Sequence, residues 1–227
     1  MSVLQYTTVI PAEFCSRPNR FIAICKVAGQ ETVCHVKNTG RCKELLIPGC
    51  RVFLTPGENP ARKTPYDLIA VEKEGEMINI DSVAPNKAAG EWLPSFLPQG
   101  AVVRPETKFG NSRMDFYAKA EEQEILIEVK GVTLKQNGVA LFPDAPTTRG
   151  VKHLKELTHA VKQGYTCYVL FVIQMKGVTH FSPNRQTDPD FAEALKEAQD
   201  AGVSVLALDC TVTPNSMEIH GEIPVII

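Results

Sequence analysis

The sequence lacks several features that would indicate a function class directly. It has no phosphate-binding loop of the G-x-x-x-x-G-K-[ST] or G-x-G-x-x-G type, no internal repeat and no low-complexity segment. Its longest apolar run, residues 165–173, is about half as long as a membrane-spanning helix and fits a buried strand. The first residues show neither a basic region nor an extended apolar segment. We therefore expect no secretory signal, no membrane association and a cytoplasmic location.

Cysteine is present, but not in the pairs that bind structural metals. The 7 cysteines include no C-x-x-C motif, and their odd number argues against a full set of disulfides. Five of them lie between residues 15 and 50, so a metal or redox site in that region stays open. We favour the interpretation that they are small reduced side chains packed in alternating strands of a cytosolic protein.

Size and charge indicate two globular domains, one of them with a basic region. The 227 residues are 44% hydrophobic and 22% charged, which is typical of a soluble protein with a real core. The net charge is −2, so the total does not indicate a polyanionic partner. Residues 13–51, however, carry only three glutamates against seven cations: Arg17, Arg20, Lys26, Lys37, Arg41, Lys43 and Arg51. This basic patch is compatible with a surface that binds nucleic acid and equally with an ordinary solvent-exposed surface.

Short strands separated by turn residues fill residues 6–80, with no long helix. Strands are predicted at 21–27 and 31–36, joined by a turn, then at 51–55, and finally as a hairpin of 66–72 and 76–80. Five strands of this kind predict a small barrel, and the pattern alone fits an OB-type and an SH3-like barrel equally well. A linker at 81–85 follows, and Asn86 is expected to cap a helix that Pro94 stops.

The remaining residues alternate between strands and helices. A strand at 102–104 precedes a predicted β-hairpin over residues 113–131, whose second strand is mostly apolar. Helices are expected at 148–163 and 188–201, and a nearly continuous apolar strand at 165–174 reads as a central parallel strand. Strands at 204–209 and 218–226 close the domain.

Charged residues in the hairpin suggest a metal site. Asp115 lies at the head of its first strand, and Glu128 and Lys130, two apart at the end of the second, project from one face. Two carboxylates beside one ammonium can offset the cost of burial by holding a divalent cation, and oxygen ligands suit Mg²⁺. The lysine could then orient or deprotonate a water. A purely structural Glu–Lys pair explains the same residues.

These motifs resemble known families. Asp115 with E-V-K at 128–130 resembles the D…E-x-K core of the PD-(D/E)xK nuclease superfamily. H-V-K-N-T-G-R, S-R-M-D-F, G-V-T-L and V-A-L-F-P-D-A-P-T-T-R-G-V-K-H-L-K-E-L are similar to segments of the sugar fermentation stimulation protein A (SfsA) family, over essentially the whole chain. The resemblance implies a mixed α/β protein: an N-terminal OB-fold β-barrel (1–83), then a PD-(D/E)xK nuclease-like α/β domain (84–227), with DNA as the partner.

The resemblance also assigns candidate residues. It implies a Mg²⁺ or Mn²⁺ site held by Asp115 and Glu128, with Glu106 as a candidate third carboxylate and Lys130 as the catalytic lysine. Residues expected to contact DNA are Arg17, Arg20, Lys37, Asn38, Arg41, Arg113, Arg149 and His153. Turn chemistry alone explains the segment around Asn38 as well as phosphate contact does. Arg149 and His153, four apart on the 148–163 helix, are expected at the mouth of the site.

Two functions from different classes follow. The first is a DNA-binding protein with a metal-dependent nuclease site that hydrolyses phosphodiester bonds. The second is a non-catalytic DNA-binding regulator of sugar metabolism genes that retains a nuclease fold. Because a degenerate site usually loses its lysine or one carboxylate, and Asp115, Glu128 and Lys130 are all present, the first is favoured. Fold alone does not decide between them.

Overall fold

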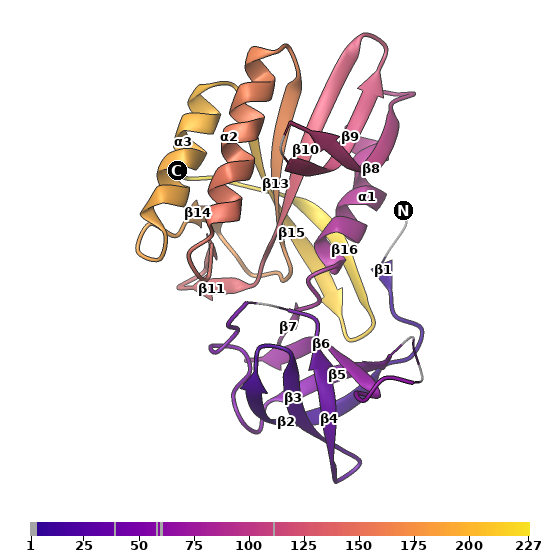
Figure 1. Ribbon diagram of the computed structural model, residues 1–227. Helices are drawn as coiled ribbons and strands as arrows, with labels where there is room; N and C mark the ends of the chain where they lie inside the picture. The colour runs from indigo at the N-terminus through magenta and orange to yellow at the C-terminus, as the bar shows by residue number, and fades with distance from the viewer. Residues whose placement is uncertain (1–3, 39, 58, 60, 111) are drawn as a thin grey trace.

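A computed structural model of the chain describes residues 4–38, 40–57, 59, 61–110 and 112–227. Residue 39 of the H-V-K-N-T-G-R segment and residues 1–3 lie outside these ranges. The described chain folds into a barrel and a larger α/β domain; in Figure 1 the barrel lies below the α/β domain. Within this part of the chain, no helix has the length and apolar character needed to cross a membrane.

The first domain is a closed barrel. Its sheet runs in the order β4-β3-β2-β5-β6-β7, and a parallel pairing of β4 with β6 from Cys34↔Tyr66 to Val36↔Leu68 closes it. The strands are β2 (Ile10–Asn19), β3 (Ile22–Val27), β4 (Gln30–Val36), β5 (Arg51–Pro56), β6 (Tyr66–Lys73) and β7 (Glu76–Asn79). The barrel is the OB fold predicted from the resemblance, with β2–β6 as its wall and β7 extending beyond it.

Cysteines line the barrel interior. Cys25, Cys34 and Cys42 are almost fully buried, and all seven thiols of the chain are free. Burial, the largest cause, raises the pKa of the Cys42 thiol to about 11. A protonated, enclosed thiol packs as a small apolar side chain. Cys25 on β3 and Cys34 on β4 alternate with more exposed neighbours, as we expected, whereas Cys42 lies between β4 and β5.

The second domain is a mixed sheet covered on both faces. Its strand order is β1-β16-β15-β13-β10-β9-β8, and β13 pairs in parallel with both β10 and β15. The strands are β1 (Leu4–Gln5), β8 (Val102–Phe109), β9 (Ser112–Ala120), β10 (Gln123–Val132), β13 (Thr166–Ile173), β15 (Ser204–Thr213) and β16 (Ser216–Ile223). The predicted hairpin and the predicted central parallel strand are both confirmed.

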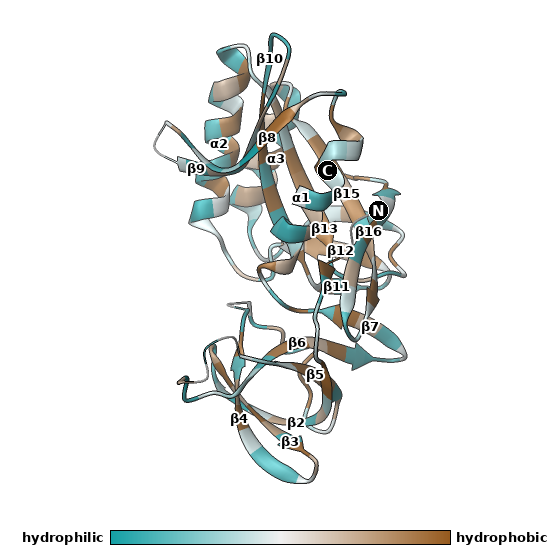
Figure 2. Cartoon of the chain, turned by 90° about the vertical axis from the view of Figure 1, so that its right-hand side faces the viewer, coloured by the Kyte–Doolittle hydropathy of each residue, from teal (hydrophilic) through white to brown (hydrophobic). Residues whose placement is uncertain are grey.

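Helices flank this sheet, and a small sheet lies beside it. In Figure 1, α2 (Thr148–Lys162) and α3 (Pro189–Asp200) cover one face, and α1 (Ala84–Phe96) covers the other. Figure 2 shows the apolar colouring concentrated on the inner strands β13 and β15. A three-stranded sheet is made of β11 (Leu134–Gln136), β12 (Val139–Phe142) and β14 (His180–Pro183).

Two details differ from the sequence-based expectations. Leu4 and Gln5 pair with Met217 and Ser216 of β16, so the N-terminal end of the predicted first domain, 1–83, contributes to the sheet of the second. Pro94 does not stop α1, which runs on to Phe96. A proline costs a helix the hydrogen bond from its own nitrogen, but the burial of Leu93 and Leu97 on either side keeps this last turn helical.

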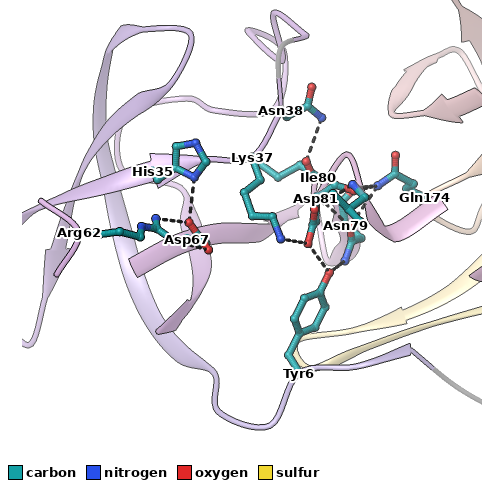
Figure 3. A network of polar contacts seen from close by, with 11 residues as sticks. Tyr6, His35, Lys37, Asn38, Arg62, Asp67, Asn79, Ile80, Asp81 and Gln174 are labelled. Carbon is teal, nitrogen blue, oxygen red and sulfur yellow. Dashed lines mark hydrogen bonds and ion pairs between the residues drawn. The ribbon is translucent and has the colours of Figure 1, made fainter. Parts of the chain in front are cut away.

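An ion cluster joins the strands that close the barrel (Figure 3). Arg62 donates to both carboxylate oxygens of Asp67, at 3.1 and 2.5 Å, and His35 Nδ1 lies 2.9 Å from Oδ1. His35 and Asp67 are register partners across the parallel β4–β6 pair. Although burial, the largest cause, pushes the pKa of Asp67 upward, the Arg62 and His35 contacts hold it below its ordinary value overall.

A buried polar network joins the two domains (Figure 3). Gln174, just after β13, donates through Nε2 to the backbone oxygens of Asn79 and Asp81 at 3.1 and 3.2 Å. The Asp81 carboxylate accepts from Lys37 Nζ at 3.0 Å and from the Tyr6 hydroxyl at 3.2 Å. Buried polar groups satisfied in this way hold one specific arrangement, so the junction fixes the barrel relative to the nuclease-like sheet.

Gly131 fits tightly against this junction, which gives a testable expectation. A Cβ at this position would lie 2.7 Å from both Gln174 Oε1 and Pro85 Cγ. We expect Gly131→Ala to lower the free energy of unfolding by about 1–3 kcal/mol, as overpacking does, measured by urea denaturation. The control is Gly221→Ala in β16, where a Cβ would meet nothing within 4 Å. Equal stability of the two variants would contradict the tight fit.

Candidate functional site

Asp115 and Glu128 lie where strands β9 and β10 separate. The ladder between the strands runs from Gln123↔Ala120 to Ile127↔Phe116, and the next opposing positions are Glu128 and Asp115. There the N–H of Val129 donates to Asp115 Oδ2 at 2.8 Å. A side-chain carboxylate thus accepts a backbone hydrogen bond at the point where the strands diverge, and this leaves room for side chains between them.

Asp115 is held by a second hydrogen bond from α1. Asn86 Nδ2 donates to Asp115 Oδ1 at 2.7 Å. Asn86 lies in the first turn of α1, so its side chain positions the Asp115 carboxylate. The prediction that Asn86 caps the helix is wrong. Burial, followed by the negative charge of Glu128, raises the pKa of Asp115 above its ordinary value. The two carboxylates therefore interact through a poorly solvated space.

Glu128 is almost completely buried and only half satisfied. Its Oε1 accepts from Lys130 Nζ and contacts His153 Nδ1. Its Oε2 is buried and has no hydrogen-bond partner among the described residues. Burial, the largest cause, would raise the pKa of Glu128, but the contacts with His153 and Lys130 lower it overall. Glu128 is thus held as a carboxylate with one oxygen open.

Lys130 and His153 support Glu128 from two elements. Lys130 is two residues along β10, and its side chain is 13% exposed. His153 belongs to α2 and is 5% exposed. Arg149 Nε lies 3.4 Å from His153 Nε2. Since arginine can only donate, Nε2 accepts, and Nδ1 carries the proton that it donates to Glu128.

Glu106 and Arg113 pair with each other near this site. Their side chains are 3.3 Å apart and more than 60% exposed. The register on either side places Glu106 opposite Asp115, but Glu106 has φ 54°, so the backbone turns at this position. Among the described residues, no group of three or more His, Cys, Asp or Glu side chains is placed to hold a metal ion. The structure therefore brings Asp115 and Glu128 together without Glu106.

The two carboxylates fit a divalent cation by their chemistry. Glu128 Oε2 is a buried acceptor without a donor, and such an atom costs free energy unless something positive satisfies it. From the residues that the structure describes, each Asp115 oxygen accepts one hydrogen bond and keeps a further lone pair. Mg²⁺ commonly takes one or two carboxylates and retains water. Asp115 and Glu128 are the residues that would hold such an ion.

The pKa values of Asp115 and Glu128 are shifted in opposite directions, so neutralising each carboxylate should change the stability of the protein in opposite directions. Because the ionised form of Asp115 is disfavoured by folding, Asp115→Asn removes an unfavourable charge and should raise the free energy of unfolding, with the Asn86 amide turned so that its oxygen accepts from the new amide. Glu128→Gln removes a carboxylate that folding favours and should lower it. Thermal unfolding in the presence of a chelator checks both. Loss of stability in Asp115→Asn would contradict the proposed repulsion between the two carboxylates.

Three of the predicted DNA-contact residues are engaged inside the protein. Arg17 donates to the backbone oxygens of Arg20, Asn38, Gly40 and Arg41 at 2.6–3.0 Å. Lys37 pairs with Asp81, and Asn38 Nδ2 donates to the oxygen of Ile80 at 2.9 Å. These side chains hold the backbone at Asn38, Gly40 and Arg41 and the domain linker in place. Their role toward DNA stays a prediction.

Other cations of the barrel face solvent. A cavity of about 410 Å³ lies between the barrel and the loop at Ala145, and its lining includes Arg20, Arg41 and Lys43. Arg20 lies over the ring of Phe21, 5.7 Å from its centroid, and Phe21 is 49% exposed. The cavity is therefore positively charged, and Arg20 on its wall also contacts the exposed ring of Phe21, which lies outside the lining. Lys43, which no sequence motif singled out, is part of it because the 40–46 turn folds over the barrel.

Comparison with known proteins gives matches to both domains. Residues 83–216 match the family described as "Sugar fermentation stimulation protein RE domain", and residues 15–80 match "SfsA N-terminal OB domain". The sugar fermentation stimulation protein homolog of Clostridium beijerinckii is 50% identical over 99% of this chain and 100% of its own. The homolog of Desulfitobacterium hafniense strain DCB-2 is 53% identical over 95% of each chain.

A solved structure also aligns over the full length. It is described as the structure of Pyrococcus furiosus SfsA in complex with Ca²⁺. It covers 100% of both chains at 31% identity, with a TM-score of 0.89. The order of barrel, linker and mixed sheet is thus the same in the two proteins.

Proposed function

Because this chain belongs to the sugar fermentation stimulation protein family, with an OB domain followed by an RE domain, we propose that it binds DNA and hydrolyses phosphodiester bonds with the help of a divalent cation. The catalytic group is the cluster of Asp115, Glu128 and Lys130. The barrel supplies part of the DNA-binding surface. The proposal keeps the cytoplasmic location expected from the sequence.

One observation carries the proposal: the open, buried oxygen of Glu128 beside a second carboxylate. A purely structural Glu–Lys pair would satisfy both carboxylate oxygens and would gain nothing from Asp115, whose negative charge opposes that of Glu128. Carboxylates pushed together in this way are typical of sites with a chemical task. The Ca²⁺ complex of the P. furiosus relative supports a divalent ion, and we extend it to Mg²⁺ or Mn²⁺ here.

The residues divide the work between them. When bound, the divalent cation supplies Lewis-acid polarisation of a phosphoryl oxygen and activation of water. Lys130 places a positive charge where the attacked phosphate gains negative charge. Asn86 fixes the orientation of Asp115, and His153 fixes that of Glu128. In hydrolysis, water oxygen bonds to phosphorus and gives up one proton, the bond from phosphorus to one bridging oxygen breaks, and the departing oxygen takes up one proton, so that the protons balance.

For phosphate contacts outside the metal site, we assign the cationic side chains that are exposed to solvent. Arg20, Arg41 and Lys43 line the barrel cavity, and Arg149 is exposed beside His153. Such contacts hold the backbone and carry little sequence information. We therefore expect affinity that falls steeply with salt and depends little on sequence.

The test is cleavage by the intact protein. Single-stranded, duplex and branched DNA are incubated with Mg²⁺, with Mn²⁺ and with chelator, and the products are separated on denaturing gels. Cleavage with either metal and none with chelator is the expected result. Isothermal titration with Mn²⁺ in the absence of DNA measures metal binding separately. If no substrate is nicked under any condition, the catalytic part of the proposal fails.

A second function is favoured by a different observation. Glu128 Oε1 is already paired with Lys130 and His153, and no third carboxylate joins the pair among the described residues. A DNA-binding regulator that retains the nuclease fold would need no more than this. Salt-dependent DNA binding without cleavage would support the regulator, and cleavage would exclude it as the sole function.

A further inference from the structure

We propose that the β8–β9 hairpin is a second phosphate-binding surface, which holds the DNA backbone alongside the metal site. The surface, which we call the hairpin ladder, consists of Arg104, Lys108, Arg113 and Lys119. It rests on the proposed function, because it holds the DNA strand that the carboxylate cluster would act on. Of these residues only Arg113 stands out in the sequence.

The strand register places the four cations on one face. Lys108 opposes Arg113, Arg104 opposes Tyr117, and Lys119 opposes Val102. Along β9 the exposed or half-exposed positions 113, 115, 117 and 119 alternate with buried ones. Side chains two residues apart on a strand share a face at a spacing of about 6.6–6.8 Å. The four cations of the ladder therefore share one face of the hairpin, together with the carboxylates of Glu106 and Asp115 that lie between them.

Most of this charge is not neutralised by the protein. Arg104, Lys108, Arg113 and Lys119 are all exposed. Among the described residues, Arg104, Lys108 and Lys119 have no ion pair, and only Arg113 has one, with Glu106. The same face also carries the carboxylates of Glu106, Asp115 and, opposite Lys119 on β10, Glu124, so three of the four cations lack an ion pair within the described part of the chain although acidic residues share their face. Exposed cations that share a face attract a polyanion and are otherwise repelled by one another.

The ladder continues into the catalytic cluster. Asp115 occupies the same face of β9, between Arg113 and Tyr117. The left-handed backbone of Glu106, opposite Asp115, bends the hairpin at this level. Figure 2 shows β9 curving away from the sheet with largely hydrophilic colouring. A backbone lying along the ladder passes directly beside Asp115, so one phosphate reaches the cluster while its neighbours meet Lys108, Arg104 and Lys119.

A different explanation predicts a different result. β8 is the edge strand of the seven-stranded sheet, and exposed cations on an edge strand prevent pairing with other molecules. If edge protection were the only role, removing the charges would cause self-association and leave DNA binding unchanged. The two explanations are therefore separable in one set of variants.

The experiment neutralises the ladder and measures DNA binding with chelator present, so that no strand is cut. The variant is Arg104→Gln, Lys108→Gln, Lys119→Gln in the full chain, and the probes are a fluorescent single strand and the matching duplex, read by anisotropy. Three lost phosphate contacts should lower affinity about tenfold or more at ~0.1 M salt and reduce the slope of log K against log salt by about 2–3. The probe that loses more identifies the strand form held by the ladder.

Controls keep the outcomes distinct. The matched variant neutralises three exposed cations outside the hairpin: Lys176, Arg185 and Lys196. Lys108→Arg with Lys119→Arg retains the charge and should bind like wild type, and circular dichroism checks folding. Unchanged affinity in the neutralised hairpin overturns the ladder, whereas wild-type cleavage with Mn²⁺ would leave the proposed function standing. Failure of the wild-type protein to bind either probe overturns both.

Discussion

Replacing Lys130 with methionine should lower the rate of metal-dependent DNA cleavage by about 10³-fold and leave DNA affinity within about twofold. Methionine keeps the length and apolar stem of the side chain but removes the ammonium that we propose to face the attacked phosphate. Loss of one positioned charge or proton donor typically costs 10²–10³ in rate. His153 still contacts Glu128 Oε1 in this variant, so the carboxylate stays placed. Single-turnover cleavage measures the loss.

Asp115→Ala should be equally inactive for a different reason. It removes one of the two carboxylates and leaves the Val129 N–H and the Asn86 amide without their acceptor. Mn²⁺ affinity, measured by titration, should fall in Asp115→Ala and stay near the wild-type value in Lys130→Met. The control Lys196→Met lies on α3 and should cleave normally. Cleavage by Asp115→Ala at the wild-type rate would show that the reaction does not take place at this cluster.

Replacing Asp67 with asparagine should destabilise the barrel by about 3 kcal/mol, near the lower end of what is measured when one partner of a buried ion pair is removed. Arg62 and His35 would both lose the carboxylate that joins β4 to β6. A change of this size lowers the melting temperature by roughly 6–12 °C. Urea denaturation followed by circular dichroism measures it.

The pH dependence of this effect follows from the sign of the pKa shift. The pKa of Asp67 in the folded protein lies below its ordinary value, so its contribution is fully present above the ordinary carboxyl pKa. It is lost as the pH falls through the folded pKa, where the carboxylate is protonated. The stability difference between wild type and Asp67→Asn should therefore shrink in acid. Asp200→Asn, which breaks the exposed pair with Lys196, should have little effect at any pH.

The central hairpin could be predicted because its signals are local. Alternating apolar residues fix β9, a charged turn joins the strands, and a nearly continuous apolar run fixes β10. The positions of Asp115, Glu128 and Lys130 follow from these strands. Strand β2 was missed because it contains Pro11 and Pro18, which usually argue against a strand. Its pairing with both β3 and β5 is a tertiary contact that its own sequence does not indicate.

The partners of the site could not be read from the sequence. The spacing of the apolar residues predicts the helix that carries His153. The burial of His153, however, depends on where α2 packs over β10. Asn86 suits a helix cap in sequence, and only the approach of α1 to β9 makes it a partner of Asp115. Arg17 reads as an exposed cation, and only the folded chain shows that it donates to the backbone oxygens of Asn38, Gly40 and Arg41. In each case the decisive contact is distant along the chain.

The polar junction at Gln174 limits how the family can have diversified. The linker is bonded from the barrel by Lys37, which donates to the Asp81 carboxylate, and from the larger domain by Gln174, which donates to the backbone oxygen of Asp81. The two partners of each bond lie far apart in the sequence. A recombination event that exchanged only one domain would separate the linker from Lys37 or from Gln174, the residues that hold it. Modular reshuffling, common elsewhere for small barrels, is therefore disfavoured here, and the two halves should descend together as one inherited unit.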